Sequence, residues 1–292
     1  MHLNAGALRL AEEIVSRSNT LGVACHTTAD GVRVVDCGVK AAGSIEAGIL
    51  LARAAMAGLG TVHVEQPGHS PEAFNQVWPA CEWPIVAVES DAPLAACLAS
   101  QYAGWKVSTP HYFAMASGPI RAAIGQENLF DDIGMRERPN TAVGLLEASK
   151  LPPDDVCLSL AADAGVPADS LVLLVARTAS IAGTLQVIAR SLETALHKLH
   201  ELHFDLRRIR RGSGRAPLAP VPPKDDLVAI GRTNDAILYG GHVVLEVTGD
   251  DASLVDIGPR MISRASADYG VPFCTLFERP CRQSGAGGPC RD

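Results

Sequence analysis

The sequence is poor in aromatic residues and contains no long uninterrupted apolar run. Phe, Trp and Tyr account for 4% of its 292 residues, although 47% of the residues are hydrophobic. The longest apolar candidate, residues 48–60, is interrupted by Arg53, whereas a membrane-spanning helix needs about 20 consecutive apolar residues. Glu12 and Glu13 interrupt the first 18 residues, where a secretory signal would be apolar. We therefore expect a cytoplasmic protein that does not enter a membrane.

Four common catalytic motifs are also missing. The chain has no P-loop, no G-x-G-x-x-G after a strand, no H-E-x-x-H and no G-x-S-x-G. Their absence argues against nucleotide hydrolysis, dinucleotide redox chemistry, zincin chemistry and the usual serine-hydrolase arrangement. The net charge of −7 argues against a dedicated nucleic-acid-binding protein.

The eight cysteines include no C-x-x-C pair. In a chain of this length without a secretory signal, their distribution indicates reduced, mostly buried thiols rather than a disulfide framework. Cys274, Cys281 and Cys290 lie close to the end of the sequence. Residues 280–292 have almost no apolar content, so we expect a disordered tail there and no function for its cysteines.

Short β-branched runs alternate with longer segments of helical periodicity. The expected strands are residues 32–35, 61–65, 85–89, 171–175 and 243–247. The expected helices lie within residues 1–18, 44–56, 91–98, 154–164 and 180–204. This alternation predicts an α+β (mixed α/β) fold. On length alone we place a boundary near residue 140, which gives domains at residues 1–140 and 141–279.

Two runs of one residue type invite a ligand-binding interpretation. His197, His200 and His203 follow an H-x-x-H-x-x-H pattern. Helical residues six apart point in different directions, so only two of them, with a carboxylate, could share a metal ion. Residues 205–215 contain five arginines, which could bind the phosphate or carboxylate groups of a ligand. For both runs we favour solvated surface, or a subunit contact for the arginines, and we expect no metal site.

The segment at 180–204 is the most informative helix. Five apolar residues recur at intervals of three and four, namely Leu185, Ile188, Leu192, Leu196 and Leu199. A second, polar stripe contains Gln186, Arg190, Glu193, His197 and His200. Arg190 and Glu193 are three residues apart, so their side chains can meet. They form either an exposed ion pair of little energetic consequence or, if the stripe lines a cleft, a base and its electrostatic partner.

The same helix resembles a segment of the methenyltetrahydromethanopterin cyclohydrolases. The similar residues, 178–195, read T-A-S-I-A-G-T-L-Q-V-I-A-R-S-L-E-T-A. Six other segments resemble that family in the same order: V-D-C-G (35–38), G-S-I-E-A-G (43–48), A-C-L-A-S-Q-Y-A-G-W (96–105), S-G-P (117–119), G-R-T-N-D-A (231–236) and S-A-D-Y-G-V-P-F (266–273). The resemblance runs from about Leu10 to Phe277, and the joint order of its motifs makes it specific.

The resemblance implies an enzyme that reversibly hydrolyses 5,10-methenyl-tetrahydromethanopterin to the 5-formyl form. It implies two mixed α/β domains with the pterin in the cleft between them. It also implies no metal and no cofactor besides the carrier substrate, no nucleic-acid partner, and a homo-oligomer, often a trimer. The family's catalytic Glu and its neighbouring Arg match Glu193 and Arg190.

This reaction suits these two residues. The methenyl carbon lies between two nitrogens that share a positive charge, so the substrate is already electrophilic, and one water has to be positioned and deprotonated. We expect Glu193 to be the base. We expect Arg190 to orient Glu193, to keep it ionised against the effect of burial, and to offset its attraction for the substrate cation.

Further polar residues are expected to bind the pterin, namely Gln186, Gln101, Ser117, Gly118, Arg121, Asn234 and Asp235. Gln186 lies one turn before Arg190. Residues 117–119, followed by Arg121, predict a tight turn that presents backbone N–H groups and a cation at a wall of the cleft. Gln101 and residues 233–235 could bind the donor and acceptor edge of the pterin, although an Asn-Asp pair is also typical of a plain turn.

The chain departs from the family pattern beside its motifs and at its end. Arg177, Ala99 and Ala116 stand where Pro, Gly and Gly are common, and no F-Y-K-I-D-like stretch follows Arg279. This leaves a second interpretation, a C-terminally truncated or divergent paralogue that binds a pterin or partner subunits without turnover. A third interpretation, hydrolysis of a folate carrier, differs in the substrate only, and the sequence does not distinguish it.

Overall fold

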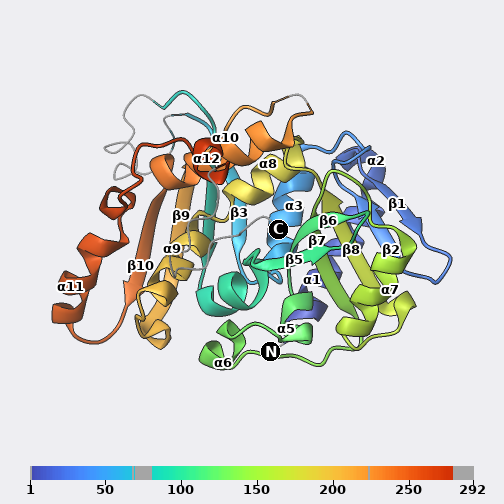
Figure 1. Ribbon diagram of the computed structural model, residues 1–292, viewed down its shortest axis with the longest axis horizontal. Helices are drawn as coiled ribbons and strands as arrows, with labels where there is room; N and C mark the ends of the chain where they lie inside the picture. Colours follow the sequence, from blue (N-terminus) through green and yellow to red (C-terminus); the bar gives the residue numbers. More distant parts are fainter. Residues whose placement is uncertain (1, 68, 70–80, 223, 279–292) are drawn as a thin grey trace.

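The computed structural model describes residues 2–67, 69, 81–222 and 224–278, which form two β-sheets flanked by helices (Figure 1). The predicted α+β class is confirmed. The larger sheet contains, in spatial order, β1 (Ala24–Thr27), β2 (Arg33–Asp36), β8 (Leu171–Ala176), β7 (Ala142–Glu147), β6 (Phe113–Ser117) and β5 (Trp105–Ser108). The smaller contains β10 (His242–Val247), β9 (Ile209–Pro217), β4 (Ile85–Ser90) and β3 (Thr61–Glu65).

The larger sheet is parallel at its centre. β8 runs parallel to β2 on one side and to β7 on the other, whereas the remaining neighbours are antiparallel. The register aligns Asp36 with Val175 and Glu147 with Ala176. The carboxyl ends of β2, β8 and β7 therefore meet at one edge, the edge at which open α/β sheets bind ligands.

Helices supply the remaining regular structure. They are α1 (Leu3–Ser16), α2 (Ser18–Leu21), α3 (Ile45–Ala55), the π-helix η1 (Leu94–Gln101), α5 (Ile120–Ile124), α6 (Leu129–Ile133), α7 (Asp154–Asp163), α8 (Ile181–Ile188), α9 (Ser191–Glu201), α10 (Asp226–Gly240), α11 (Asp251–Met261) and α12 (Phe273–Phe277), together with the 3-10 turns η2 (Ala168–Ser170), η3 (Leu206–Arg208) and η4 (Ser263–Ala265). The predicted N-cap of α3 is confirmed, because the Ser44 hydroxyl accepts the N–H of Ala47 at 3.1 Å.

At its centre, in β7 and β8, the larger sheet is buried on both faces, as the continuous apolar sequence of β8 requires. Val172 and Leu174 pack with residues of α1 and α3. Leu173 and Val175, on the opposite face, pack with residues of α7.

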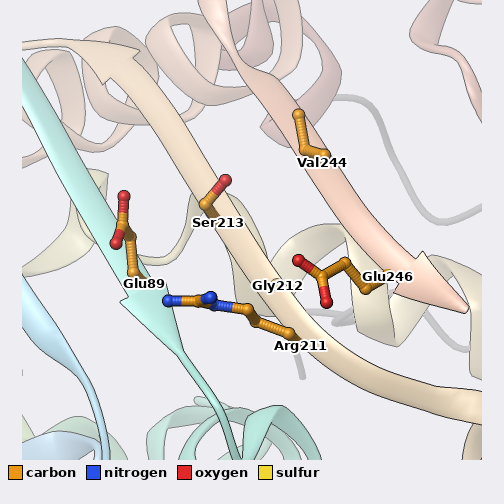
Figure 2. Close-up of a pocket in the computed structure, with 6 residues that line it drawn as sticks. All are labelled: Glu89, Arg211, Gly212, Ser213, Val244 and Glu246. Carbon is orange, nitrogen blue, oxygen red and sulfur yellow. The ribbon is translucent and has the colours of Figure 1, made fainter.

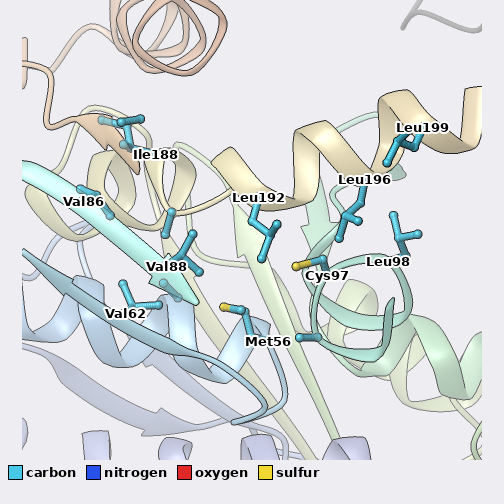
Figure 3. Packing of buried hydrophobic residues seen from close by; sticks show 14 of the residues in the cluster. Met56, Val62, Val86, Val88, Cys97, Leu98, Ile188, Leu192, Leu196 and Leu199 are labelled. Carbon is cyan, nitrogen blue, oxygen red and sulfur yellow. The ribbon is translucent and has the colours of Figure 1, made fainter. Parts of the chain in front are cut away.

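Two helices connect the cores of the two sheets. Leu51 of α3 lies in the core of the larger sheet, whereas Met56, directly after α3, lies in the core of the smaller sheet. α8 also contributes residues to both cores. α3 and α8 lie between the sheets in Figure 1. A Cβ added at Gly48 would lie 3.0 Å from Cα of Ala182, so glycine permits this close approach. α9 adds Leu192, with two further leucines, to the core over β4 (Figure 3).

The predicted strands are all confirmed, but the predicted helix at 180–204 is wrong as a single element. It is two helices, α8 and α9, separated by a break at Ala189 and Arg190. The predicted helix at 91–98 forms as a π-helix that continues to Gln101. Each sheet takes strands from both sides of residue 140. The two-domain division and the cleft between domains stay predictions, and the expected tail lies outside the described residues.

Candidate active site

The break between α8 and α9 determines how Arg190 is placed. The N–H of Arg190 bonds back only three residues, to Val187, and Arg190 is the N-cap of α9 with φ −85° and ψ 8°. The side-chain amide of Gln101, at the end of η1, donates to the carbonyl oxygen of Ala189 at 3.1 Å. Glu193 consequently occupies the first turn of α9, where the helix dipole favours a negative charge.

Glu193 is buried, with an exposed fraction of 5%. Its Oε1 atom has no hydrogen-bond partner among the described residues. Burial raises the pKa of Glu193 from 4.5 to about 7, while Arg190 and Arg121 act in the opposite direction. A carboxylate with this pKa and a free oxygen is suited to take a proton from water near neutral pH.

Arg190 does not form an ion pair with Glu193, which was one of the two interpretations of this pair. Among the described residues its ion-pair partner is Glu147, with Nη1 of Arg190 3.7 Å from Oε2 of Glu147. Its Nη2 donates to Oε1 of Gln186 at 3.2 Å, which confirms that these two residues adjoin. The Nε of Arg190 is buried without a partner in the described structure. Arg190 thus influences Glu193 through charge alone.

Two further polar residues of the site, Glu147 and Thr178, were not among the predicted site residues. Glu147 ends β7, and Thr178 follows β8, so parallel pairing of these strands brings the two side chains together. The hydroxyl of Thr178 donates a hydrogen bond to Oε1 of Glu147. The available signal was positional, because polar residues directly after buried parallel strands lie at the ligand-binding edge.

Unpartnered polar atoms concentrate around this site. In the described part of the chain, six buried side-chain polar atoms lack a hydrogen-bond partner, and all but one belong to Ser100, Gln101, Arg190, Ser191 and Glu193. Buried polar atoms are normally paired, so such a concentration needs an explanation. The Ser191 hydroxyl faces Gly214 of β9, whereas Gln101 and Glu193 keep acceptors available to a ligand or a water.

The turn at residues 117–119 is present, but the side chain of Arg121 is buried and bonds to other residues of the protein. Gly118 has φ +91° and its N–H donates to the carbonyl of Ser100 at 2.8 Å. The fully buried guanidinium of Arg121 makes a bidentate pair with Glu127, at 2.8 and 2.7 Å, and also donates to the carbonyl of Leu98. The structure gives Arg121 a scaffold role, and Ser117 is buried at the end of β6.

Asn234 and Asp235 lie in the middle of α10, so the plain turn that was the alternative interpretation of these residues is absent. Asn234 donates to the carbonyl of Ile230 at 2.8 Å. Asp235 accepts the N–H of Phe273, the first residue of α12, at 2.9 Å. The Asp235 hydrogen bond connects α10 to α12, whereas that of Asn234 stays within α10, and neither residue has a hydrogen bond to Glu193 or Arg190.

The sequence matches one family of known proteins over nearly its whole length. The profile of the family described as "Cyclohydrolase (MCH)" matches residues 2–282. The methenyltetrahydromethanopterin cyclohydrolase of Methylobacillus flagellatus is 41% identical over 269 residues, which cover 92% of this chain and 79% of that protein. The protein of that name from Methylobacterium organophilum is 41% identical over 282 residues (95% and 84%), and that from Methanosarcina mazei is 37% identical over 270 residues (91% and 81%). The chain belongs to the cyclohydrolase (MCH) family.

The cyclohydrolase match reaches further than the predicted limits of Leu10 and Phe277, because it begins at residue 2 and ends at residue 282. It therefore continues into the segment at which a truncation was expected. The relatives from Methylobacillus and Methylobacterium extend beyond the matched region, which covers 79% and 84% of their lengths.

Two histidines of the run, His197 and His200, contact neighbouring side chains. His197 stacks on Tyr102, with ring centroids 4.5 Å apart, and His200 contacts Asp132 at 2.8 Å. The other face of Tyr102 is covered by the Arg121 guanidinium at 4.9 Å. No cluster of three potential metal-ligating His, Cys, Asp or Glu side chains occurs among the described residues.

The arginine run lies along β9 and in the turn before it. Arg215 pairs with Glu65 at 3.2 Å, and Arg211 pairs with Asp91 at 2.9 Å. Figure 2 shows a pocket on this sheet, lined by Glu89, Arg211, Gly212, Ser213, Val244 and Glu246. None of the predicted site residues lines it, so the candidate active site rests on Glu193 and its neighbours.

The cysteines among the described residues differ in burial. Three of them, Cys37, Cys97 and Cys157, are buried as expected of mostly buried thiols, whereas Cys81 and Cys274 are partly buried and Cys25 is exposed. Within the described ranges, no helix has the length and apolar character needed to cross a bilayer.

Proposed function

We propose that this chain reversibly hydrolyses 5,10-methenyl-tetrahydromethanopterin to 5-formyl-tetrahydromethanopterin. The observation that carries the proposal is the buried Glu193 carboxyl, whose pKa is raised to about 7 and whose Oε1 has no hydrogen-bond partner in the described part of the chain. Family membership supplies the substrate class, since the relatives are named for this reaction.

In the proposed reaction Glu193 is the general base. It takes a proton from water as the water oxygen bonds to the methenyl carbon, and the cation becomes a neutral hydroxy intermediate. The C–N10 bond then breaks, Glu193 returns the proton to N10, and the hydroxyl proton leaves as the formyl C=O forms. One proton is released overall. A base with a pKa near the working pH can serve in both proton transfers.

Arg190 resolves a conflict in this mechanism. A carboxylate next to a cationic substrate also stabilises the ground state, and equal stabilisation of ground and transition states gives no acceleration. A nearby guanidinium reduces that attraction while it favours the ionised base. Gln186 holds the guanidinium at 3.2 Å, and Gln101 has a buried Oε1 available for the substrate or the water.

Substitution of Glu193 tests this proposal. Purified Glu193→Gln should fold and bind the pterin but lose most hydrolysis, followed as the loss of methenyl absorbance. Hydrolysis at the parent rate would refute the role of Glu193. A parent protein that binds the pterin without turnover would instead support the non-catalytic interpretation, and a folate-type methenyl substrate measured in parallel would identify the carrier.

The remaining features of the proposal concern assembly and environment. We infer a cytoplasmic homo-oligomer, with a trimer as the expected state, that requires no metal and no cofactor besides its substrate. Light scattering on the purified protein would determine the oligomeric state. Activity that survives exhaustive treatment with a chelator, without metal restoring more, is the expected result for the metal.

A further inference from the structure

Glu147 forms an ion pair with the Arg190 guanidinium, which the sequence spacing would allow to pair with Glu193. We propose that Glu147 is a positioning residue that keeps Arg190 turned away from Glu193, so that one Glu193 oxygen stays free for the attacking water. The catalytic meaning of this inference rests on the proposed function, whereas its geometric content does not.

Glu147 is fixed through both of its carboxylate oxygens. Oε1 accepts the Thr178 hydroxyl, and Oε2 faces Nη1 of Arg190 at 3.7 Å. Because the two oxygens serve different partners, rotation of the carboxylate would disturb both contacts. The backbone of both residues is also fixed. Glu147 pairs with Ala176 of β8, and the backbone carbonyl of Thr178 accepts a hydrogen bond from the Thr184 hydroxyl at 2.8 Å.

Two carboxylates thus compete for one buried guanidinium. The Arg190 side chain is 10% exposed and the Glu147 side chain is 14% exposed, so the attraction between them is weakly screened by solvent. Glu193 is only three residues from Arg190, yet these two residues form no ion pair, and Arg190 pairs with Glu147 instead. Removing the competing charge would leave Arg190 with Glu193, on whose charge it already acts, as a partner.

The other groups around Glu193 cannot take over this function. The charges that act on Glu193 are those of Arg190 and of Arg121 on α5. Arg121 is held by the bidentate pair with Glu127 and cannot turn to a new partner without breaking it. From the η1 side, Cys97 and Tyr102 face Glu193, and its charge contributes to the raised pKa of each. Arg190 is therefore the adjustable cation of the site.

The test is a titration of the Glu193 carboxyl that does not need turnover. Protein labelled with 13C at the glutamate carboxyl carbon is titrated by NMR, and the Glu193 signal is assigned by its loss in Glu193→Gln. In Glu147→Gln we expect the midpoint to fall by about 1 pH unit or more, the size of shift that one close guanidinium produces. The matched control Asp131→Asn removes a carboxylate from an exposed pair with Arg136 and should leave the midpoint unchanged.

A double-mutant cycle separates repositioning of Arg190 from simple loss of a negative charge. In the Arg190→Gln background, Glu147→Gln should no longer move the Glu193 midpoint. A shift of the same size in both backgrounds would overturn the inference, as would an unchanged or raised midpoint in folded Glu147→Gln. If Glu147→Gln does not fold, Thr178→Val, which frees Oε1 of Glu147, decides by the same criteria, with a smaller fall expected. Failure of the parent to hydrolyse the substrate would refute the proposed function and leave this titration interpretable.

Discussion

Gln101 donates its side-chain amide to the backbone carbonyl of Ala189, across 88 residues of sequence, and so connects the π-helix to the break before the candidate catalytic residues. π-helical turns occur frequently at functional sites because they re-aim side chains that a regular helix would place elsewhere. Here the N–H of Tyr102 bonds to the carbonyl of Cys97, five residues back, and this wider turn carries Gln101 to Ala189.

We expect Gln101→Leu to lower the free energy of unfolding by about 1–3 kcal/mol, since it leaves the buried Ala189 carbonyl without its donor. It should also lower kcat, because Ala189 precedes Arg190. Urea unfolding and steady-state kinetics would measure both effects. Gln126→Leu, at an exposed position, is the control and should change neither. Parent-like stability of Gln101→Leu would contradict the structural role assigned to this hydrogen bond.

Glu193 should make stability depend on pH. Its pKa is raised from 4.5 to about 7, so the folded state binds a proton more tightly than the unfolded state. The parent therefore loses stability as pH rises from 4.5 through 7, by roughly 3 kcal/mol. Glu193→Gln lacks this loss. Its unfolding free energy should exceed that of the parent at pH 8, and the difference should vanish near pH 4.5. A difference that is independent of pH would show that the carboxyl does not titrate in this range.

Replacing Arg190 should move the pH dependence of the reaction. Arg190 lowers the pKa of Glu193, so Arg190→Gln should raise that pKa above about 7. Because the base must be deprotonated, the acidic limb of the kcat profile should shift to higher pH, and kcat at pH 7 should fall. Arg190→Lys, which keeps the charge, should restore part of the shift. An acidic limb at the parent position in Arg190→Gln would exclude this coupling.

Arg121→Met should affect stability more than chemistry. The substitution leaves Glu127 without its bidentate partner and removes donors from the carbonyl of Leu98, so we expect a loss of about 3–5 kcal/mol in unfolding free energy. The double variant Arg121→Met/Glu127→Met should recover much of it, because both charges are then removed. Chemical denaturation of the three proteins would measure this. A folded, fully stable Arg121→Met that binds the pterin weakly would instead restore Arg121 to the binding site.

Local patterns were sufficient to predict five strands, β2, β3, β4, β8 and β10, and the N-cap at Ser44, because hydrophobic alternation and capping depend on neighbouring residues. They did not predict β1, β5, β6, β7 and β9. The break at Ala189 could not be predicted in this way. The apolar spacing of Leu185, Ile188 and Leu192 continues across it, while the contacts that hold it come from Gln101 and Glu147, which are distant in sequence.

The site residues also include some that the sequence could indicate and some that it could not. The resemblance indicated Glu193 and Arg190, and helical spacing indicated Gln186, which contacts Arg190. Neither gave any indication of Glu147. That residue reaches Arg190 only because β7 and β8 pair in parallel. The side-chain direction of Arg121 and the helical context of Asn234 are likewise set by tertiary packing, which overrides the turn preference of short polar residues.

The interleaving of the two sheets also affects how the chain can fold during synthesis. β8 separates β2 from β7, and β9 separates β4 from β10, so neither sheet is continuous until residues 171–176 and 209–217 have left the ribosome. Until then the apolar strands β2 and β4 lack their neighbours β8 and β9. Pairings this distant in sequence close slowly. We therefore expect a slow-folding nascent chain whose exposed early strands are substrates for chaperones.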